Sequence, residues 1–142
     1  MLLLELALEI AEQAHAGQVD KAGKDYIQHP IYVSSLVESP EAKAVALLHD
    51  VLEDSDYTAE DLLEAGVPYK IVEAVEILTK QPGESYDDYL CRVIDNELAR
   101  VVKIADLIHN SDLTRLHKVT QQDLDRQEKY REAIVFLAMA EE

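Results

Sequence analysis

The residues that this sequence lacks already exclude several kinds of protein. Cys91 is its single cysteine, so no internal disulfide can form, and a reducing compartment such as the cytoplasm is favoured. The chain has only four glycines, and it contains no glycine-rich phosphate-binding loop. The catalytic and metal-binding motifs H-E-x-x-H and C-x-x-C are missing as well.

Basic residues and long apolar runs are also scarce. The 142 residues include 13 Lys and Arg against 29 Asp and Glu, which gives a formal net charge of −16. Phosphate backbones and anionic membrane surfaces are bound through Lys and Arg, so this charge argues against nucleic acid and membrane partners. No apolar run is long enough to cross a bilayer. The leucine-rich start lacks a basic segment and holds Glu5, Glu9 and Glu12, which favours an amphipathic helix over a secretory signal.

What is present favours a single domain over residues 1–142. Apolar and aromatic residues make up 48% of the chain, which is enough for one sizeable core. Because these residues recur at helical spacing and no segment is a convincing strand, the sequence predicts an all-α fold, a compact bundle of about seven helices. The expected helical segments are 2–15, a short one after Pro30, 39–54, 58–66, 68–80, 85–96, 97–113 and 123–142.

One predicted helix carries polar residues beside apolar ones. The stretch LLHDVLEDS, residues 47–55, sets His49, Asp50, Glu53 and Asp54 among leucines and valine. Residues three and four apart are neighbours on a helix, so these side chains are expected to form one polar patch. Burying such groups costs free energy unless something holds them, and a metal ion is the first candidate.

Two further segments supply groups of the same kind. KIADLIHNSD places Asp106, His109 and Asn110 on one side of a predicted helix. His29 precedes Pro30, which should restrict it to an extended conformation and fix the direction of its imidazole. Two His and two Asp suit a divalent transition ion with positions left open for water or substrate. The candidate ligands are His29, His49, Asp50 and Asp106.

Each of these features also has a plainer interpretation. A His beside an Asp is most often a hydrogen-bonded pair, and LEDSD is also consistent with a solvated helix end. His109 is either a group that orients a ligand or a core histidine. We interpret His15 and His117 as structural or surface residues. Spacing alone leaves both interpretations of the cluster open.

The same residues resemble the signature of a known family. His29, the dipeptide His49-Asp50 and then Asp106 resemble the H…HD…D pattern of the HD-domain metal-dependent phosphohydrolases. More specifically, three segments are similar to the hydrolase domain of the RelA/SpoT-type (p)ppGpp enzymes and its small stand-alone relatives. These segments are HAGQVDKAGKDYIQHPIYV, ALLHDVLED and VVKIADLIHN. The resemblance covers nearly the whole chain.

The resemblance implies an all-helical HD fold that holds one divalent ion, usually Mn²⁺. It implies that the chain removes pyrophosphate from the 3′ position of ppGpp or pppGpp, through attack of water on the 3′-linked phosphorus. The matching ligands are His29, His49, Asp50 and Asp106. Glu53 and Asp54 match the acidic pair of hydrolysis, and which of them is the base stays open. Lys21 and Asn110 match positions that help hold the nucleotide.

One departure from the family pattern concerns the substrate. Relatives that act on the alarmone commonly read R-K-S-G where this chain reads DKAG, so Asp20 replaces an Arg that packs on guanine, and Ala22 replaces a Ser. An anion at this position and the net charge of −16 oppose capture of a highly anionic nucleotide. Two alternatives therefore stand: an HD phosphohydrolase of another nucleotide or phosphate ester, and a non-catalytic HD-fold binding or scaffold protein. The sequence leaves the oligomeric state open.

Overall fold

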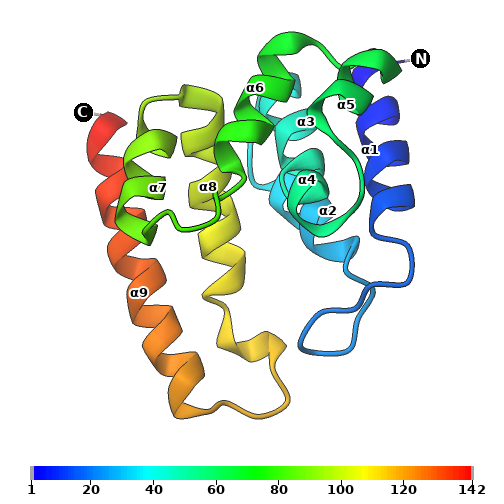
Figure 1. Ribbon diagram of the computed structural model, residues 1–142. Coiled ribbons are helices and arrows are strands. Elements are labelled where there is room, and N and C mark those ends of the chain that lie inside the picture. Colours follow the sequence, from blue (N-terminus) through cyan, green and yellow to red (C-terminus); the bar gives the residue numbers. More distant parts are fainter. Residues whose placement is uncertain (1, 142) are drawn as a thin grey trace.

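A computed structural model describes residues 2–141, and it is built from helices joined by short connections (Figure 1). The described residues contain no β-strand, only an isolated antiparallel bridge between Val19 and Asp25. The all-α prediction is confirmed: the described residues form nine α-helices where eight helical segments were expected, and residue 142 of the last predicted segment lies outside the described residues. The α-helices are α1 (Leu3–Ala14), α2 (Gln28–Ser35), α3 (Pro40–Leu48), α4 (Val51–Asp54), α5 (Ala59–Ala65), α6 (Tyr69–Leu78), α7 (Tyr86–Ile94), α8 (Glu97–Asn110) and α9 (Gln121–Ala138). Two 3-10 helices, Leu113–Arg115 and Met139–Glu141, complete the chain.

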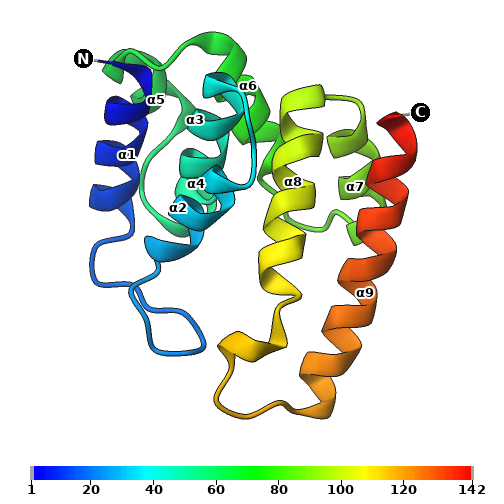
Figure 2. The ribbon, with the colours of Figure 1, turned by 180° about the vertical axis from the view of Figure 1, so that it is seen from behind.

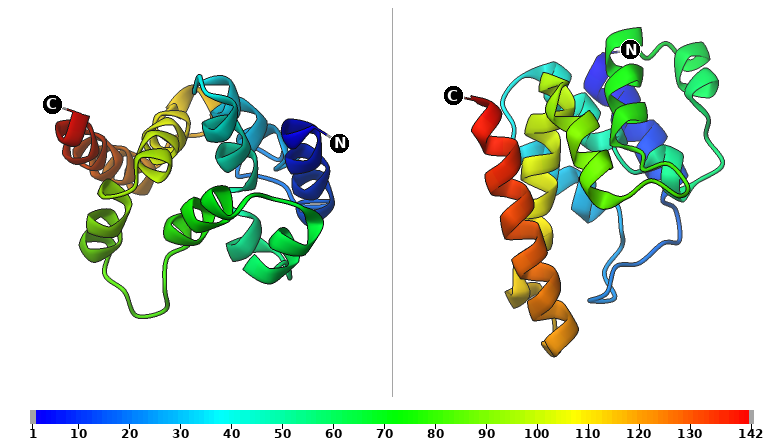
Figure 3. Two further views of the ribbon diagram at one scale, coloured as in Figure 1. Left: turned by 90° about the horizontal axis from the view of Figure 1, so that it is seen from above. Right: turned by 60° about the vertical axis from the view of Figure 1, so that its left-hand side comes forward.

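The helices form two groups with α8 between them. Figures 1 and 2 show α1 to α6 on one side of α8 and α7 and α9 on the other. Figure 3 shows the same order from above. The loop after α1 and the connection from α8 to α9 lie at one end of the molecule (Figure 1). None of the helices in residues 2–141 has both the length and the apolar character needed to cross a membrane.

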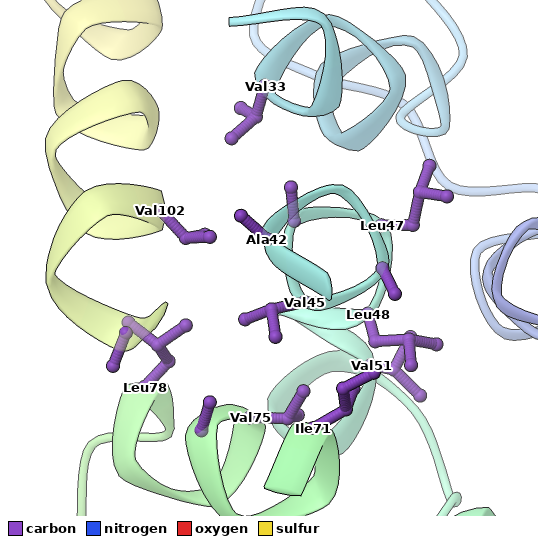
Figure 4. Packing of buried hydrophobic residues seen from close by; sticks show 14 of the residues in the cluster. Val33, Ala42, Val45, Leu47, Leu48, Val51, Ile71, Val75, Leu78 and Val102 are labelled. Atoms are coloured by element: carbon purple, nitrogen blue, oxygen red, sulfur yellow. The ribbon is translucent and has the colours of Figure 1, made fainter. Parts of the chain in front are cut away.

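Helix α3 lies at the centre of the core and fixes the start of the polar cluster. It contacts α1, α2, α6 and α8, and its residues Ala42 and 44–48 are buried. Figure 4 shows Val33 of α2, Val102 of α8 and Val75 of α6 directed toward it. Three alanines among those buried residues leave room for neighbouring helices to approach closely. The C-terminal end of α3, where His49 follows, is therefore held from several sides.

The structure corrects the prediction of one helix over residues 39–54. Helix α3 ends at Leu48, and α4 begins at Val51. The Nδ1 atom of His49 donates to the carbonyl oxygen of Ala46 at 2.5 Å, and the His49 amide also points to this oxygen at 3.5 Å. The imidazole thus competes for the carbonyl that would continue the helical ladder. The break places His49 and Asp50 between the two helices.

Helix α5 offers a matched test of core packing. Thr58 and Asp61 form a capping box at its start, and Gly66, with φ of 105°, ends it in the left-handed region. Leu62 is fully buried, whereas the adjacent Leu63 is 41% exposed. We expect Leu62→Ala to lower the free energy of unfolding by about 2–5 kcal/mol. Leu63→Ala, with the same change in helix propensity, should cost far less, as measured by urea denaturation. Equal costs would show that α5 is not anchored through Leu62.

Candidate metal centre

Four predicted ligands from three parts of the chain meet between α2, α3 and α8. His29 lies in the first turn of α2, His49 and Asp50 lie in the break between α3 and α4, and Asp106 lies on α8. His29 Nε2 is 2.8 Å from Asp106 Oδ1 and 4.0 Å from Asp50 Oδ2. His49 Nε2 is 3.0 Å from Asp50 Oδ2 and 3.3 Å from Asp106 Oδ1. Both histidines and Asp106 are buried. The structure brings together all four residues that the sequence nominated.

The structure differs from the sequence in the backbone of His29. Pro30 was expected to hold His29 in an extended conformation, but both residues are helical and belong to α2. A proline is tolerated in the first helical turn, because the amide groups of that turn have no intrahelical partner. The imidazole of His29 is also fixed at both ring nitrogens, by Asp106 at 2.8 Å and by His109 at 2.7 Å.

The hydrogen bonds of His49 leave one of its nitrogens facing the carboxylates. Since Nδ1 donates to Ala46, the neutral ring has a lone pair and no proton on Nε2. This buried Nε2 has no hydrogen-bond partner in the part of the chain that the structure describes, although two carboxylate oxygens lie near it. Burial lowers the pKa of His49, but Asp50 and Asp106 together raise it well above its usual value. The point between these atoms favours a positive charge.

His109, whose role the sequence left open, contacts the predicted ligand His29. The Nδ1 atoms of the two rings are 2.7 Å apart, so one must donate and the other accept. Burial, Arg115 and His29 lower the pKa of His109 to about 4, which keeps it neutral near pH 7. As the structure stands, His29 Nε2 donates to the ionised carboxylate of Asp106, so a neutral His29 ring accepts at Nδ1 from the Nδ1–H of His109. If a metal ion took the place of that Nε2 proton, His29 would carry its proton on Nδ1 and donate it to His109 Nδ1.

Other side chains hold the two aspartates in place. The Tyr26 hydroxyl donates to Asp50 Oδ2 at 2.5 Å, and Lys103 Nζ lies 2.9 Å from Asp106 Oδ2. Asn110 Nδ2 donates to Asp106 Oδ1 at 3.1 Å. Sequence reasoning did not select Tyr26 or Lys103, although both lie inside the quoted segments YIQHP and VVKIADLIHN. His29, His49 and Asp50 each offer a ligand atom within 4.8 Å of the others, and Asp106 Oδ1 lies 2.8 and 3.3 Å from the two imidazoles, a donor set that fits a divalent cation.

Glu53 and Asp54 lie on α4, just beyond the cluster. Burial, followed by the charge of Asp50, raises the pKa of both carboxyl groups. Neither carboxylate accepts a hydrogen bond within residues 2–141, so their oxygens remain free to contact water. They lie on the short helix that directly follows His49 and Asp50 in the chain.

Two pockets flank the cluster. The wide pocket, with a volume of about 320 Å³, has Tyr26 and His29 on its inner wall and includes Lys21 and Asn110. A smaller one of about 130 Å³, here called the lysine pocket, is lined by His49, Asp50 and Glu53 together with Lys80 and Lys103. The two predicted nucleotide-holding residues, Lys21 and Asn110, thus share one pocket, and Glu53 borders the other.

Asp20 has a structural role that the sequence did not reveal. Its Oδ1 accepts the backbone amides of Ala22 at 2.8 Å and Lys24 at 3.0 Å, which closes a tight turn in a loop expected to be irregular. Its Oδ2 lies 3.4 Å from a terminal nitrogen of Arg115, which also lines the wide pocket. Arg115 in turn donates to the carbonyl oxygen of His109 at 3.0 Å. The wide pocket therefore has an arginine, Arg115, which is paired with the Asp at position 20.

Sequence comparisons identify similar proteins but no matching family description. No protein-family model matches the chain. A GTP pyrophosphokinase of Streptomyces coelicolor is 33% identical over 132 residues, covering 84% of this chain and 16% of that protein. The guanosine-3′,5′-bis(diphosphate) 3′-pyrophosphohydrolase of Haemophilus influenzae is 36% identical over 116 residues, covering 71% of this chain and 17% of that protein. The chain thus spans less than a fifth of the length of these two relatives.

The structural comparison covers nearly the whole chain. A metazoan SpoT orthologue, described as hydrolysing ppGpp and playing a role in starvation responses, matches with a TM-score of 0.76 at 24% identity. The match covers 96% of this chain and 85% of that one. The predicted all-α HD-type fold is therefore confirmed. In sequence, the chain is similar to one segment of the RelA/SpoT-type (p)ppGpp enzymes, as its motifs indicated. In fold, it is similar to a SpoT orthologue.

Proposed function

We propose that this chain is a metal-dependent phosphohydrolase, acting as one domain, that removes the 3′-pyrophosphate from ppGpp or pppGpp. The observation that carries the proposal is the convergence of His29, His49, Asp50 and Asp106, with a buried Nε2 of His49 that has no partner in the described residues. The similarity to a 3′-pyrophosphohydrolase of Haemophilus influenzae and the fold of a ppGpp-hydrolysing SpoT orthologue support it.

Different residues of the chain would hold the metal ion and transfer protons. His29, His49, Asp50 and Asp106 would hold one divalent ion, proposed to be Mn²⁺. When bound, the ion acidifies water and offsets charge on phosphoryl oxygens. Glu53 and Asp54 orient the attacking water and accept its proton, because their carboxylates are unpaired and their pKa values are raised toward the working pH.

The wide pocket is the proposed site of the nucleoside. Its volume of about 320 Å³ lies at the small end of ligand pockets, which are about 300–1,000 Å³. Lys21 is exposed at its rim and would pair with phosphoryl oxygens. Asn110 lines the same pocket and joins it to the cluster through Asp106. The substrate's 3′ phosphate would then lie over the cluster.

A substrate panel tests this proposal. Freshly purified protein loaded with Mn²⁺ is incubated with ppGpp, pppGpp, other nucleotides and simple phosphate esters, and pyrophosphate and phosphate are measured separately. We expect pyrophosphate and GDP from ppGpp. Release of phosphate from another ester, with ppGpp left unhydrolysed, would support an HD phosphohydrolase of another nucleotide or phosphate ester. Inactivity on all compounds, together with no bound metal, would support a non-catalytic binding or scaffold protein. A cytoplasmic location follows from the same proposal and stays a prediction.

Arg115 is expected to supply part of the substrate affinity. We expect Arg115→Ala to raise KM for ppGpp about tenfold or more, since hydrogen bonds to charged groups contribute about 1.5–3 kcal/mol. The turnover number should change little, because Arg115 forms no hydrogen bond or ion pair with His29, His49, Asp50 or Asp106 within the described residues. Arg131→Ala is the control, because Arg131 is exposed and pairs only with Glu128 within the described residues. A fall in turnover at unchanged KM would contradict this role.

The same contacts change the expectation for position 20. On sequence alone, Asp20→Arg would add a cation for guanine and raise kcat/KM for ppGpp. In the structure, this substitution removes two amide contacts of the turn and places Arg against Arg115. Asp20→Asn therefore tests the charge of Asp20 with less disturbance of the turn, because an Asn oxygen can still accept the two backbone amides.

A further inference from the structure

The lysine pocket holds donors that the proposed chemistry has not yet used. Its volume of about 130 Å³ corresponds to about four water molecules at about 30 Å³ each, which is the scale of phosphoryl groups and too small for a nucleoside. It borders the cluster through His49 and Asp50, whereas the wide pocket meets the cluster through His29. A molecule that spans the cluster therefore has the wide pocket for one end and the smaller lysine pocket for the other.

Tyr86, which lines this pocket, has a hydroxyl that is an unused donor. This hydroxyl is buried and has no hydrogen-bond partner in the part of the chain that the structure describes. The nearby Tyr89 shows the contrast, because its hydroxyl donates to the carbonyl oxygen of Leu78 at 2.7 Å. A buried unpaired donor is unfavourable, and an anion in the pocket would satisfy it.

Two lysines, Lys80 and Lys103, line the pocket together with the carboxylates of Asp50 and Glu53. Lys103 is fixed by Asp106 at 2.9 Å and lies 5.4 Å from the centre of the Tyr89 ring. Lys80 is exposed on the connection between α6 and α7 and forms no ion pair within residues 2–141. That connection is tied down by Arg92, which contacts Glu84 at 2.6 and 2.8 Å and also donates to the carbonyl oxygen of Ile77. Lys80 is thus a cation outside any ion pair in residues 2–141, on an anchored loop.

We propose that the lysine pocket is a subsite for the pyrophosphate group, with Lys80 and Tyr86 as its binding residues. The inference rests on the proposed function and adds the place of one product to it. In the reaction, the oxygen of water bonds to the 3′-linked phosphorus, and the bond from that phosphorus to the ribose 3′ oxygen breaks. One proton of water ends on the ribose oxygen, and the pyrophosphate remains in the lysine pocket. Glu53 lines the same pocket as the bound anion.

Binding of inorganic pyrophosphate tests the subsite without any turnover. The full chain loaded with Mn²⁺ is titrated calorimetrically with pyrophosphate and separately with GDP, and metal content is measured after each titration, because pyrophosphate chelates divalent ions. We expect Lys80→Met to raise the Kd for pyrophosphate about tenfold or more, and Tyr86→Phe to raise it about 2–10-fold. The Kd for GDP should not change. Lys118→Met and Tyr69→Phe, both exposed positions, are the matched controls.

The possible outcomes separate this inference from the proposed function. Weaker pyrophosphate binding in both variants supports the subsite even if ppGpp is not turned over. Unchanged pyrophosphate binding overturns it even if ppGpp is hydrolysed, and so does a wild-type protein that does not bind pyrophosphate. An equal loss of GDP affinity would also overturn it, because the pocket would then serve the nucleotide. Tyr86→Phe removes an unpaired buried hydroxyl, so the variant should fold with an unchanged or higher Tm.

Discussion

Replacing Glu53 by Gln is expected to lower turnover of the preferred substrate by about 10²–10⁴-fold, the usual contribution of general acid–base catalysis. Gln keeps the size and shape of the side chain but removes the carboxylate that would accept the proton. The pKa of Glu53 is raised by burial and by Asp50, which brings its proton affinity closer to that needed near neutral pH. Metal content should stay at the wild-type value, because Glu53 is not one of the four converging ligands.

The Glu53 experiment needs a second glutamate as its control. Glu60→Gln on α5 makes the same chemical change on an exposed helix outside both flanking pockets. Turnover is measured at saturating substrate, and bound metal is measured in the same preparations. If Glu53→Gln keeps wild-type turnover, Glu53 is only part of a polar helix face, and Asp54 carries the role alone.

Loss of a predicted ligand should remove the metal entirely. His49→Ala and Asp50→Ala are each expected to abolish stoichiometric binding of a divalent ion, measured by elemental analysis after gel filtration. The reason is geometric: His49 Nε2 lies within 3.3 Å of both Asp50 and Asp106, so one truncation removes a donor from the middle of the set. Activity should fall with the metal.

Stability provides an independent readout of the same variants. A ligand present at 100 times its Kd stabilises a folded protein by about 2.7 kcal/mol. Added metal should therefore raise the unfolding free energy of the wild type by about this amount, with little effect on His49→Ala or Asp50→Ala. His117→Ala is the control, because His117 is exposed and lies outside both pockets. Unchanged metal content in both ligand variants would remove these residues from the ligand list.

Local patterns in the sequence determined the secondary structure and the candidate residues. Helical spacing of apolar residues predicted the α-helices, and caps such as Thr58 and Gly66 act through neighbouring atoms of the chain. The residues His29, His49, Asp50 and Asp106 were nominated by type and motif. The error over residues 39–54 is also local: spacing continued through His49, but its ring took the carbonyl of Ala46.

Contacts between distant segments were decided only by the tertiary structure. His29 meets Asp106 across 77 positions, and Asp20 meets Arg115 across 95. Packing of α2 and α8 against α3 brings the first pair together, and the shared end of the molecule brings the second pair together (Figure 1). From the sequence, Asp20 was interpreted as an anion that opposes capture of the nucleotide. In the fold, Asp20 closes a turn and pairs with Arg115. The sequence by itself determined which chemical groups are available. The docking of helices decided which of them touch, because side-chain contacts depend on distance in space and not on separation along the chain.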